Sequence, residues 1–305
     1  MNTQFSAAPN SPLDPQGITP ATVLPATQTR PMYWSIRREL WENRSIYIAP
    51  LVVAGVVLIG FLIATIGRAV ATVDLAQKAA VLAERNNFAA GAIMATAFIV
   101  GVFYCLDALH GERRDRSILF WKSLPVSDLT TVLSKVSIPF VILPLLTFAI
   151  IVCTQLIMLL LSSAALLISG LSAAPSTPWS QTTLVLFYHL LTVHVLWHAP
   201  IYAWLLLVSG WARRAVFLWA VLPLLAIGVI EKIAFNTSYF ATMLLHRLTG
   251  PEHLHLTAPG SVPAHPMMTF DPAEFLSTPG LWIGLAFAAA FLAAAVRLRR
   301  YREAI

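Results

Sequence analysis

Long apolar runs separated by short polar stretches dominate the chain from residue 46 onward. Crossing about 30 Å of hydrocarbon takes about 20 apolar residues in a helix, because lipid offers no hydrogen-bond partner to backbone groups outside one. Six runs satisfy this length, so we predict an all-α, polytopic membrane protein with six transmembrane helices. They cover residues 46–67, 88–106, 136–168, 183–210, 215–235 and 281–296.

The third run is ambiguous in length. A helix over residues 136–168 would be about 50 Å long, too long for one upright crossing but too short for two crossings with a turn. We predict one tilted span that continues past the membrane. Pro139 and Pro144 are expected to kink its first half.

The lysines and arginines outside these runs predict the orientation. Of the 20 such residues, fifteen fall on one side of the spans, and the other five are Arg68, Lys78, Arg85, Lys232 and Arg247. Because basic residues are retained in the cytoplasm, the side with fifteen is predicted to be cytoplasmic, together with both chain ends. Dividing the third run into two spans would move the C-terminal basic cluster outside, so the charge distribution also favours six spans.

Composition excludes a soluble protein, since 58% of residues are hydrophobic and 11% are charged. The net charge of +6 comes from short clusters between apolar runs, a pattern typical of topology signals and not of a nucleic-acid partner. Cys105 and Cys153 lie inside apolar runs and form neither a disulfide framework nor a metal motif. We predict a multi-pass protein of a cell membrane, the bacterial cytoplasmic (inner) membrane.

The stretch ahead of the first span divides into two parts. Residues 1–31 are rich in proline and small polar residues and are predicted to be a disordered cytoplasmic tail. Residues 32–45 are predicted to form an amphipathic helix in the membrane interface, with lipid as its partner; a simple flank of the first span is the alternative. Its apolar arc holds Tyr33, Trp34, Ile36, Leu40 and Trp41, and Glu39, Glu42 and Asn43 lie opposite.

The predicted cytoplasmic loop, residues 107–135, combines a dense charge cluster with four consecutive apolar residues. Exposed aromatic side chains in a loop are costly unless lipid or a partner protein covers them. We therefore predict a docking surface for a cytoplasmic protein, with charges that orient the encounter and an aromatic anchor; a loop packed on its own membrane domain is the alternative. The predicted docking residues are Glu112, Arg113, Arg114, Ser117, Ile118, Phe120, Trp121, Leu124, Pro125, Val126 and Ser127.

This loop resembles the cytoplasmic loop of type-2 ATP-binding-cassette (ABC) transporter permeases. In that family a Glu-Arg segment leads through Ser or Thr to a hydrophobic stretch ending in Leu-Pro-Val-Ser, and the loop contacts a separate ATPase. Glu112, Arg113, Ser117 and the run 124–127 fall on those positions. Many relatives carry glycine where this chain has Arg116, so the local backbone is expected to be less permissive here.

The resemblance implies a permease subunit, an exporter, that acts as a dimer with two copies of a cytoplasmic ABC ATPase. ATP and Mg would be bound by that partner, and this chain would bind no cofactor directly and would not itself be an enzyme. The sequence lacks the Gly-x-x-x-x-Gly-Lys-Ser/Thr loop that wraps backbone amides around phosphates, which agrees with this division of labour.

Two other functions compete with transport. His194 and His198 stand four residues apart and share a helix face, so an intramembrane haem or metal protein is the first alternative. A non-transporting membrane scaffold that only recruits a cytoplasmic partner is the second. His246, His253, His255 and His265 in the outer loop could together bind a metal ion, but their irregular spacing does not predict a site.

The fifth span and the long outer loop carry the remaining candidates. Glu231, near the outer end of the span, is a possible mouth of a transport pathway; the alternative is that it reaches interface water. Within the extracytoplasmic loop, residues 236–280, apolar side chains from Tyr239 to Leu248 recur at helical spacing and predict an interfacial helix. The prolines that follow predict irregular chain.

Overall fold

The regular elements are helices throughout the part of the chain that the computed structural model describes, residues 30–68, 75–117, 127–168, 179–250 and 272–301. Five of them are long and apolar enough to cross a membrane, and there are six crossings if one bent pair counts as a single span. The chain is therefore a multi-pass membrane protein. The predicted disordered tail lies outside the described residues up to residue 29, as do residues 251–271 of the predicted outer loop.

Membrane-length segments and shorter helices make up the described part of the chain. The long segments are α2 (Ser45–Arg68), α3 (Leu75–Ala108), the continuous run α6 (Asp128–Ser137), η1 (Ile138–Ile142) and α7 (Leu143–Ile168), the run α8 (Trp179–His189), η2 (Leu190–Trp197) and α9 (Ala199–Trp211), then α10 (Val216–Phe235) and α13 (Pro279–Tyr301). The short ones are α1 (Pro31–Glu42), α4 (His110–Arg114), α11 (Tyr239–Thr249) and α12 (Pro272–Ser277).

The ambiguous third run is one continuous helical segment, as the sequence predicted. Pro139 lies in η1, a π-helical turn between α6 and α7. Since proline lacks an N–H and its ring collides with the carbonyl four residues earlier, the helix widens locally to accommodate it.

The helix of the second span is longer than the sequence predicted. Its helix α3 begins at Leu75, well before residue 88, because charged residues end a hydropathy pattern without ending backbone hydrogen bonding.

The fourth span is bent, whereas the sequence predicted one uninterrupted run. Its two halves, Leu186–Trp197 and Ala199–Trp211, meet at His198 with an angle of 44°. Pro200 occupies the first turn of α9, where a backbone N–H has no intrahelical acceptor, so the missing N–H of proline loses no hydrogen bond there. The helix that precedes it cannot continue through this position, because the proline ring collides with the carbonyl four residues earlier. The break is therefore a consequence of one proline inside an apolar run.

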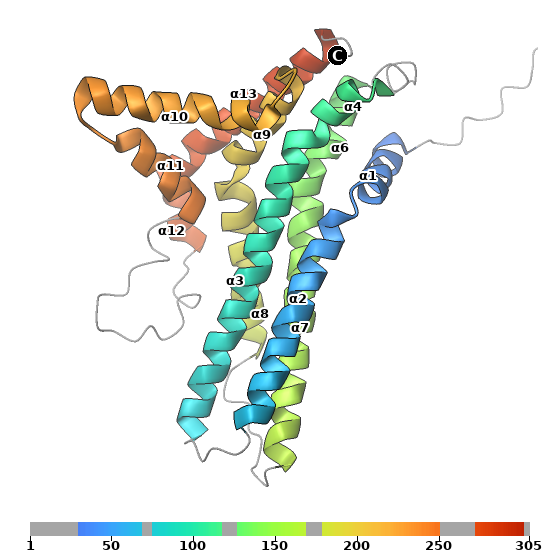
Figure 1. Ribbon diagram of the computed structural model, residues 1–305, viewed down its shortest axis with the longest axis vertical. Helices are drawn as coiled ribbons and strands as arrows, with labels where there is room; N and C mark the ends of the chain where they lie inside the picture. Colours follow the sequence, from blue (N-terminus) through green and yellow to red (C-terminus); the bar gives the residue numbers. More distant parts are fainter. Residues whose placement is uncertain (1–29, 69–74, 118–126, 169–178, 251–271, 302–305) are drawn as a thin grey trace, which may run out of the picture.

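Helix α10 leaves the side of the bundle and runs across the direction of α2, α3 and α7 (Figure 1). Ala215 before it and Asn236 after it both adopt left-handed backbone angles, with φ values of 50° and 52°. Among the described residues of α10, Ala220 is the buried one. Helix α10 therefore packs on α9 and α3 through its first part, and most of its large apolar side chains are exposed.

Helix α11 returns to the bundle at the bend of the fourth span. The Arg247 guanidinium lies 4.2 Å above the ring of Trp197, and the Trp197 indole donates to the carbonyl of His246 at 3.2 Å. Arg247 also donates to the carbonyl of Gly280. A Cβ at Gly284 would collide with this guanidinium, so the glycine is what lets Arg247 approach α13 so closely.

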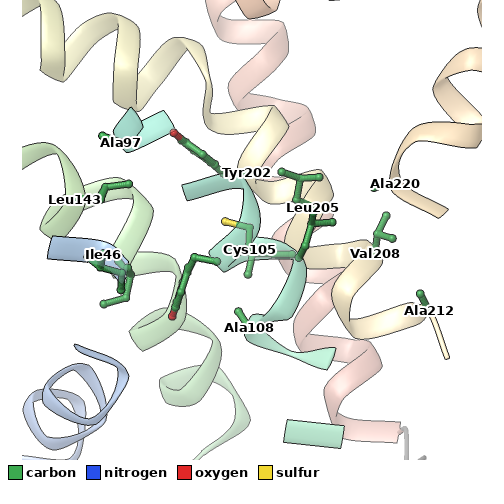
Figure 2. Close-up of a cluster of buried hydrophobic side chains, with 14 residues drawn as sticks. Ile46, Ala97, Cys105, Ala108, Leu143, Tyr202, Leu205, Val208, Ala212 and Ala220 are labelled. Carbon is green, nitrogen blue, oxygen red and sulfur yellow. The ribbon is translucent and has the colours of Figure 1, made fainter. Parts of the chain in front are cut away.

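The largest hydrophobic cluster lies where α3 and α9 cross, against the starts of α2 and α7 (Figure 2). Tyr202 is fully buried and packs over Gly101, while Cys105 lies near the centre of the cluster. Small residues such as Ala97 and Ala108 let the helix backbones come close, as is usual between membrane helices. This cluster sits next to one end of the bundle, where α1, α4, the start of α6 and the last turns of α13 meet (Figure 1). We call that end the charged end.

Candidate functional site

The short helix α4, which follows α3, is fastened to the end of α9. The backbone N–H groups of Leu109 and His110 both donate to the Ser209 hydroxyl, at 3.0 and 2.9 Å. Arg113 donates to the carbonyl of Gly210 at 2.8 Å. Carbonyls in the last turn of a helix lack intrahelical partners and carry partial negative charge, so a buried guanidinium there is well placed. The start of the predicted docking loop is therefore part of the bundle.

Glu112 of α4 lies at the centre of a group of buried charges. Its carboxylate is 3.1 Å from the Lys135 ammonium of α6 and accepts a hydrogen bond from Arg299 of α13. Arg38 of α1 lies 3.8 Å away. One carboxylate thus contacts three helices that are far apart in the sequence.

A second carboxylate, that of Glu39 in α1, shares the same cation. It accepts from Lys135 at 2.7 Å with one oxygen and from the Tyr104 hydroxyl of α3 at 2.9 Å with the other. Asp128, at the start of α6, lies 3.3 Å from Arg299. The group therefore connects α1, α3, α4, α6 and α13.

Charges of both signs meet in this group, which we call the ion cluster. Its acids are Glu39, Glu112 and Asp128, and its bases are Arg38, Lys135 and Arg299. Glu39, Glu112, Lys135 and Arg299 are 3%, 6%, 2% and 5% exposed. Buried charges of this kind gain little net stability over apolar replacements, but removing one partner is strongly destabilising. The ion cluster therefore fixes the relative positions of its helices more than it adds to the stability of the fold.

Sequence reasoning missed the ion cluster, although a signal was present. Glu39 falls between Ile36 and Leu40, and Lys135 between Val132 and Val136, all at spacings that share a helix face. In α1 the predicted arc is divided: Ile36 and Leu40 pack on the core together with Glu39, while the aromatic residues face outward. A charge inside an apolar stripe indicates a buried partner, which a sequence cannot identify.

The predicted docking charges differ in their exposure to solvent. Glu112 and Arg113, predicted to face a partner, turn inward and make intramolecular contacts. Arg114 is exposed, 3.1 Å from Asp115 and 3.9 Å from Asp107. The apolar docking residues Ile118, Phe120, Trp121, Leu124, Pro125 and Val126 lie outside the described residues.

The two serines of the motif stabilise the edges of the loop. Ser117 donates to the carbonyl of Glu112 at 3.3 Å. Ser127 is the N-cap of α6, and its hydroxyl accepts from the Thr130 N–H at 3.1 Å, as expected for this residue type. Arg116 adopts a left-handed conformation with φ 57°, which is the conformation that glycine adopts without strain.

The rings of His194 and His198 lie side by side, and the ring nitrogens of His198 face backbone carbonyls, whereas the buried Nε2 of His194 has no hydrogen-bond partner among the described residues. The His194 and His198 rings are 5.8 Å apart, edge to face, and both pack near Phe98. The ring nitrogens of His198 lie 2.8 Å from the Val193 carbonyl and 3.4 Å from the Leu248 carbonyl. In the described ranges no three histidine, cysteine or acidic side chains are arranged to hold a metal ion. These contacts join the bend of the fourth span to α11.

Glu231 caps a helix in this structure. Its carboxylate accepts from the N–H groups of Tyr239 and Phe240, at 2.7 and 2.8 Å, and from the Thr237 hydroxyl at 2.8 Å. These are the first N–H groups of α11, which have no intrahelical acceptor. The contacts account for the position of the carboxylate, and its role at a pathway mouth stays a prediction.

Comparisons of the chain with protein-family models, with curated proteins and with solved structures gave no match.

Proposed function

We propose that the chain is the membrane-spanning permease subunit of an ABC transporter, an exporter that works as a pair of permease subunits driven by separate ATPases. In this proposal the charged end faces the cytoplasm, in agreement with the distribution of basic residues. The loop between α4 and α6 would bind the ATPase through its apolar residues, with Trp121 as the anchor.

The observation that carries the proposal is the position of Glu112. This first residue of the loop motif is ion-paired with Lys135 and Arg299, and through Lys135 it reaches Glu39. A closely packed group of buried, paired charges has few alternative arrangements, so a displacement of α4 would move α1, α6 and α13 with it. Such a connection is what a loop needs if it transmits the closure of an ATPase to the spans.

Co-purification tests the docking step. The full chain, isolated from its native membrane in mild detergent, should retain an ATPase of the Walker type, identified by mass spectrometry. Trp121→Glu should abolish this association, because it places a charge in the apolar contact. Tyr301→Glu is the matched control, since it adds the same charge at another exposed aromatic of the charged end and should leave association intact. Unchanged association with Trp121→Glu would contradict the docking role.

A distance measurement separates a transporter from a scaffold. With Cys105 and Cys153 replaced, spin labels at positions 44 and 300 would report on the junction between α1 and α2 and on α13 of the complex in lipid nanodiscs. A transporter should show a shifted distance distribution with ATP and vanadate compared with no nucleotide. A scaffold binds the ATPase but keeps one distribution in both states, and that result would overturn the proposal.

A further inference from the structure

Helix α1 has two faces with different chemistry. Its inner face packs Ile36 and Leu40 on the core and buries Glu39 in the ion cluster. Its outer face exposes Trp34 and Trp41, by 58% and 66%, with Arg37 between them in the sequence. The spacings of three and four residues place these outer side chains in one stripe along the helix.

Arg37 is held by aromatic rings and not by a carboxylate. Its guanidinium carbon lies 5.4 Å from the centroid of the Trp34 ring and 4.7 Å from that of Trp41. Within the described ranges no acidic side chain forms an ion pair with Arg37, whereas the neighbouring Arg38 pairs with Glu42 and Glu112. The guanidinium is thus oriented by stacking and keeps its N–H donors available for an anion.

The position of α1 determines which anion can reach this stripe. The helix ends at Glu42, and the apolar span α2 begins three residues later at Ser45. With α2 as a membrane span, the outer face of α1 would lie beside the boundary between lipid headgroups and hydrocarbon. Indoles are enriched at this depth, and arginine binds phosphate oxygens there through paired N–H donors.

We propose that Trp34, Arg37 and Trp41 form a binding site for the headgroup phosphate of an anionic phospholipid. The guanidinium would donate to the phosphate, and the two indoles would cover the glycerol and the first part of the acyl chains. Inorganic phosphate offers nothing to the indoles, so an intact lipid is the ligand that the whole stripe fits. This inference does not depend on the proposed transport function.

Lipid at this site would act on the charged end of the bundle. Because Glu39 on the opposite face of α1 is bonded to Lys135 and Tyr104, a lipid that holds α1 in place also holds the ion cluster in place. Anything that binds the folded state and not the unfolded state raises the apparent stability. Anionic lipid should therefore raise the unfolding temperature of the protein through α1.

Lipid binding by the full chain alone tests the site. The protein in a neutral detergent would be titrated with phosphatidylglycerol, with phosphatidylcholine and with inorganic phosphate, and bound lipid would be counted by native mass spectrometry. Arg37→Gln should weaken phosphatidylglycerol binding about five-fold. Arg214→Gln, which removes an exposed charge from the loop between α9 and α10, is the matched control and should bind like the wild type.

Two further measurements test whether the planar guanidinium and an intact lipid are required. Arg37→Lys keeps the charge but loses the planar stacking, so it should bind with intermediate affinity. Phosphatidylglycerol should raise the unfolding temperature of the wild type more than that of Arg37→Gln, and inorganic phosphate should not compete with the lipid. Equal loss of binding in Arg37→Gln and Arg214→Gln, or wild-type binding by Arg37→Gln, would overturn the proposal.

Discussion

The Lys135 ammonium lies 2.7 Å from a carboxylate oxygen of Glu39, although the two residues are 96 positions apart in the chain. The same ammonium is 3.1 Å from Glu112, so one cation compensates two buried carboxylates. Helix α1, which precedes the first span, is in this way bonded to α6, which begins the third. Helix α1 therefore packs on the folded bundle, and its place in the membrane interface stays a prediction.

Loss of the shared cation should be the most damaging single change in the ion cluster. Lys135→Met leaves Glu39 and Glu112 buried without their common partner, and we expect the free energy of unfolding to fall by about 3 kcal/mol. Denaturant unfolding in detergent micelles measures this. Arg114→Gln, which removes a cation from exposed ion pairs at the same end, should unfold like the wild type. Equal stability of Lys135→Met and the wild type would show that the cluster is not a tightly packed, buried unit.

Removing the opposite charge as well should restore part of that loss. Glu39→Gln in the Lys135→Met background eliminates one of the uncompensated carboxylates, so the double variant should be more stable than the sum of the two single effects predicts. We expect a coupling free energy of about 1 kcal/mol or more from the double-mutant cycle. Strict additivity would mean that Glu39 and Lys135 do not interact in the folded protein.

The left-handed backbone at Arg116 predicts a stabilising substitution. A non-glycine residue there is disfavoured by about 1 kcal/mol, so Arg116→Gly should raise the unfolding temperature. The neighbouring Asp115 has φ −85°, where glycine has no such advantage, and Asp115→Gly should not be stabilising. If both variants melt at or below the wild-type temperature, Arg116 does not adopt this conformation.

Two glycines of α3 should respond in opposite ways to the same change. A Cβ on Gly101 would lie 3.0 Å from the Tyr202 ring and 3.2 Å from Leu143, so Gly101→Ala should destabilise the protein by about 1–3 kcal/mol. A Cβ on Gly91 meets nothing within 4 Å, so Gly91→Ala should be neutral or slightly stabilising. Thermal unfolding of the two variants gives the comparison, and a neutral Gly101→Ala would contradict the close packing of α3 on α9.

The cap of α11 can be tested at the level of single amides. Glu231→Ala removes the acceptor of the Tyr239 and Phe240 N–H groups, so these amides should exchange with solvent deuterium faster. Lys232→Ala changes the next residue without touching the cap and should leave their exchange unchanged. Protection that persists in Glu231→Ala would show that another group caps α11.

Apolar runs in the sequence predicted most of the spans, because a membrane helix is selected mainly by its length and hydropathy. The bend at His198 required more than that, since Pro200 sits in a run whose hydropathy is uninterrupted. The sideways course of α10 was not predictable either. It follows the left-handed backbone at Ala215, and alanine rarely adopts this conformation, so its residue type does not mark the turn.

Some features of the protein follow from the sequence, and others, including the candidate site, depend on the tertiary structure. The sequence by itself determined that the chain is helical and suited to lipid, because the length and hydropathy of each run depend on residues that are neighbours in the chain. Only the tertiary structure decided that Glu39, Lys135 and Arg299 surround Glu112. Their pairing depends on how helices that are distant in the chain pack together, and the sequence around a carboxylate does not identify the cation that will pair with it.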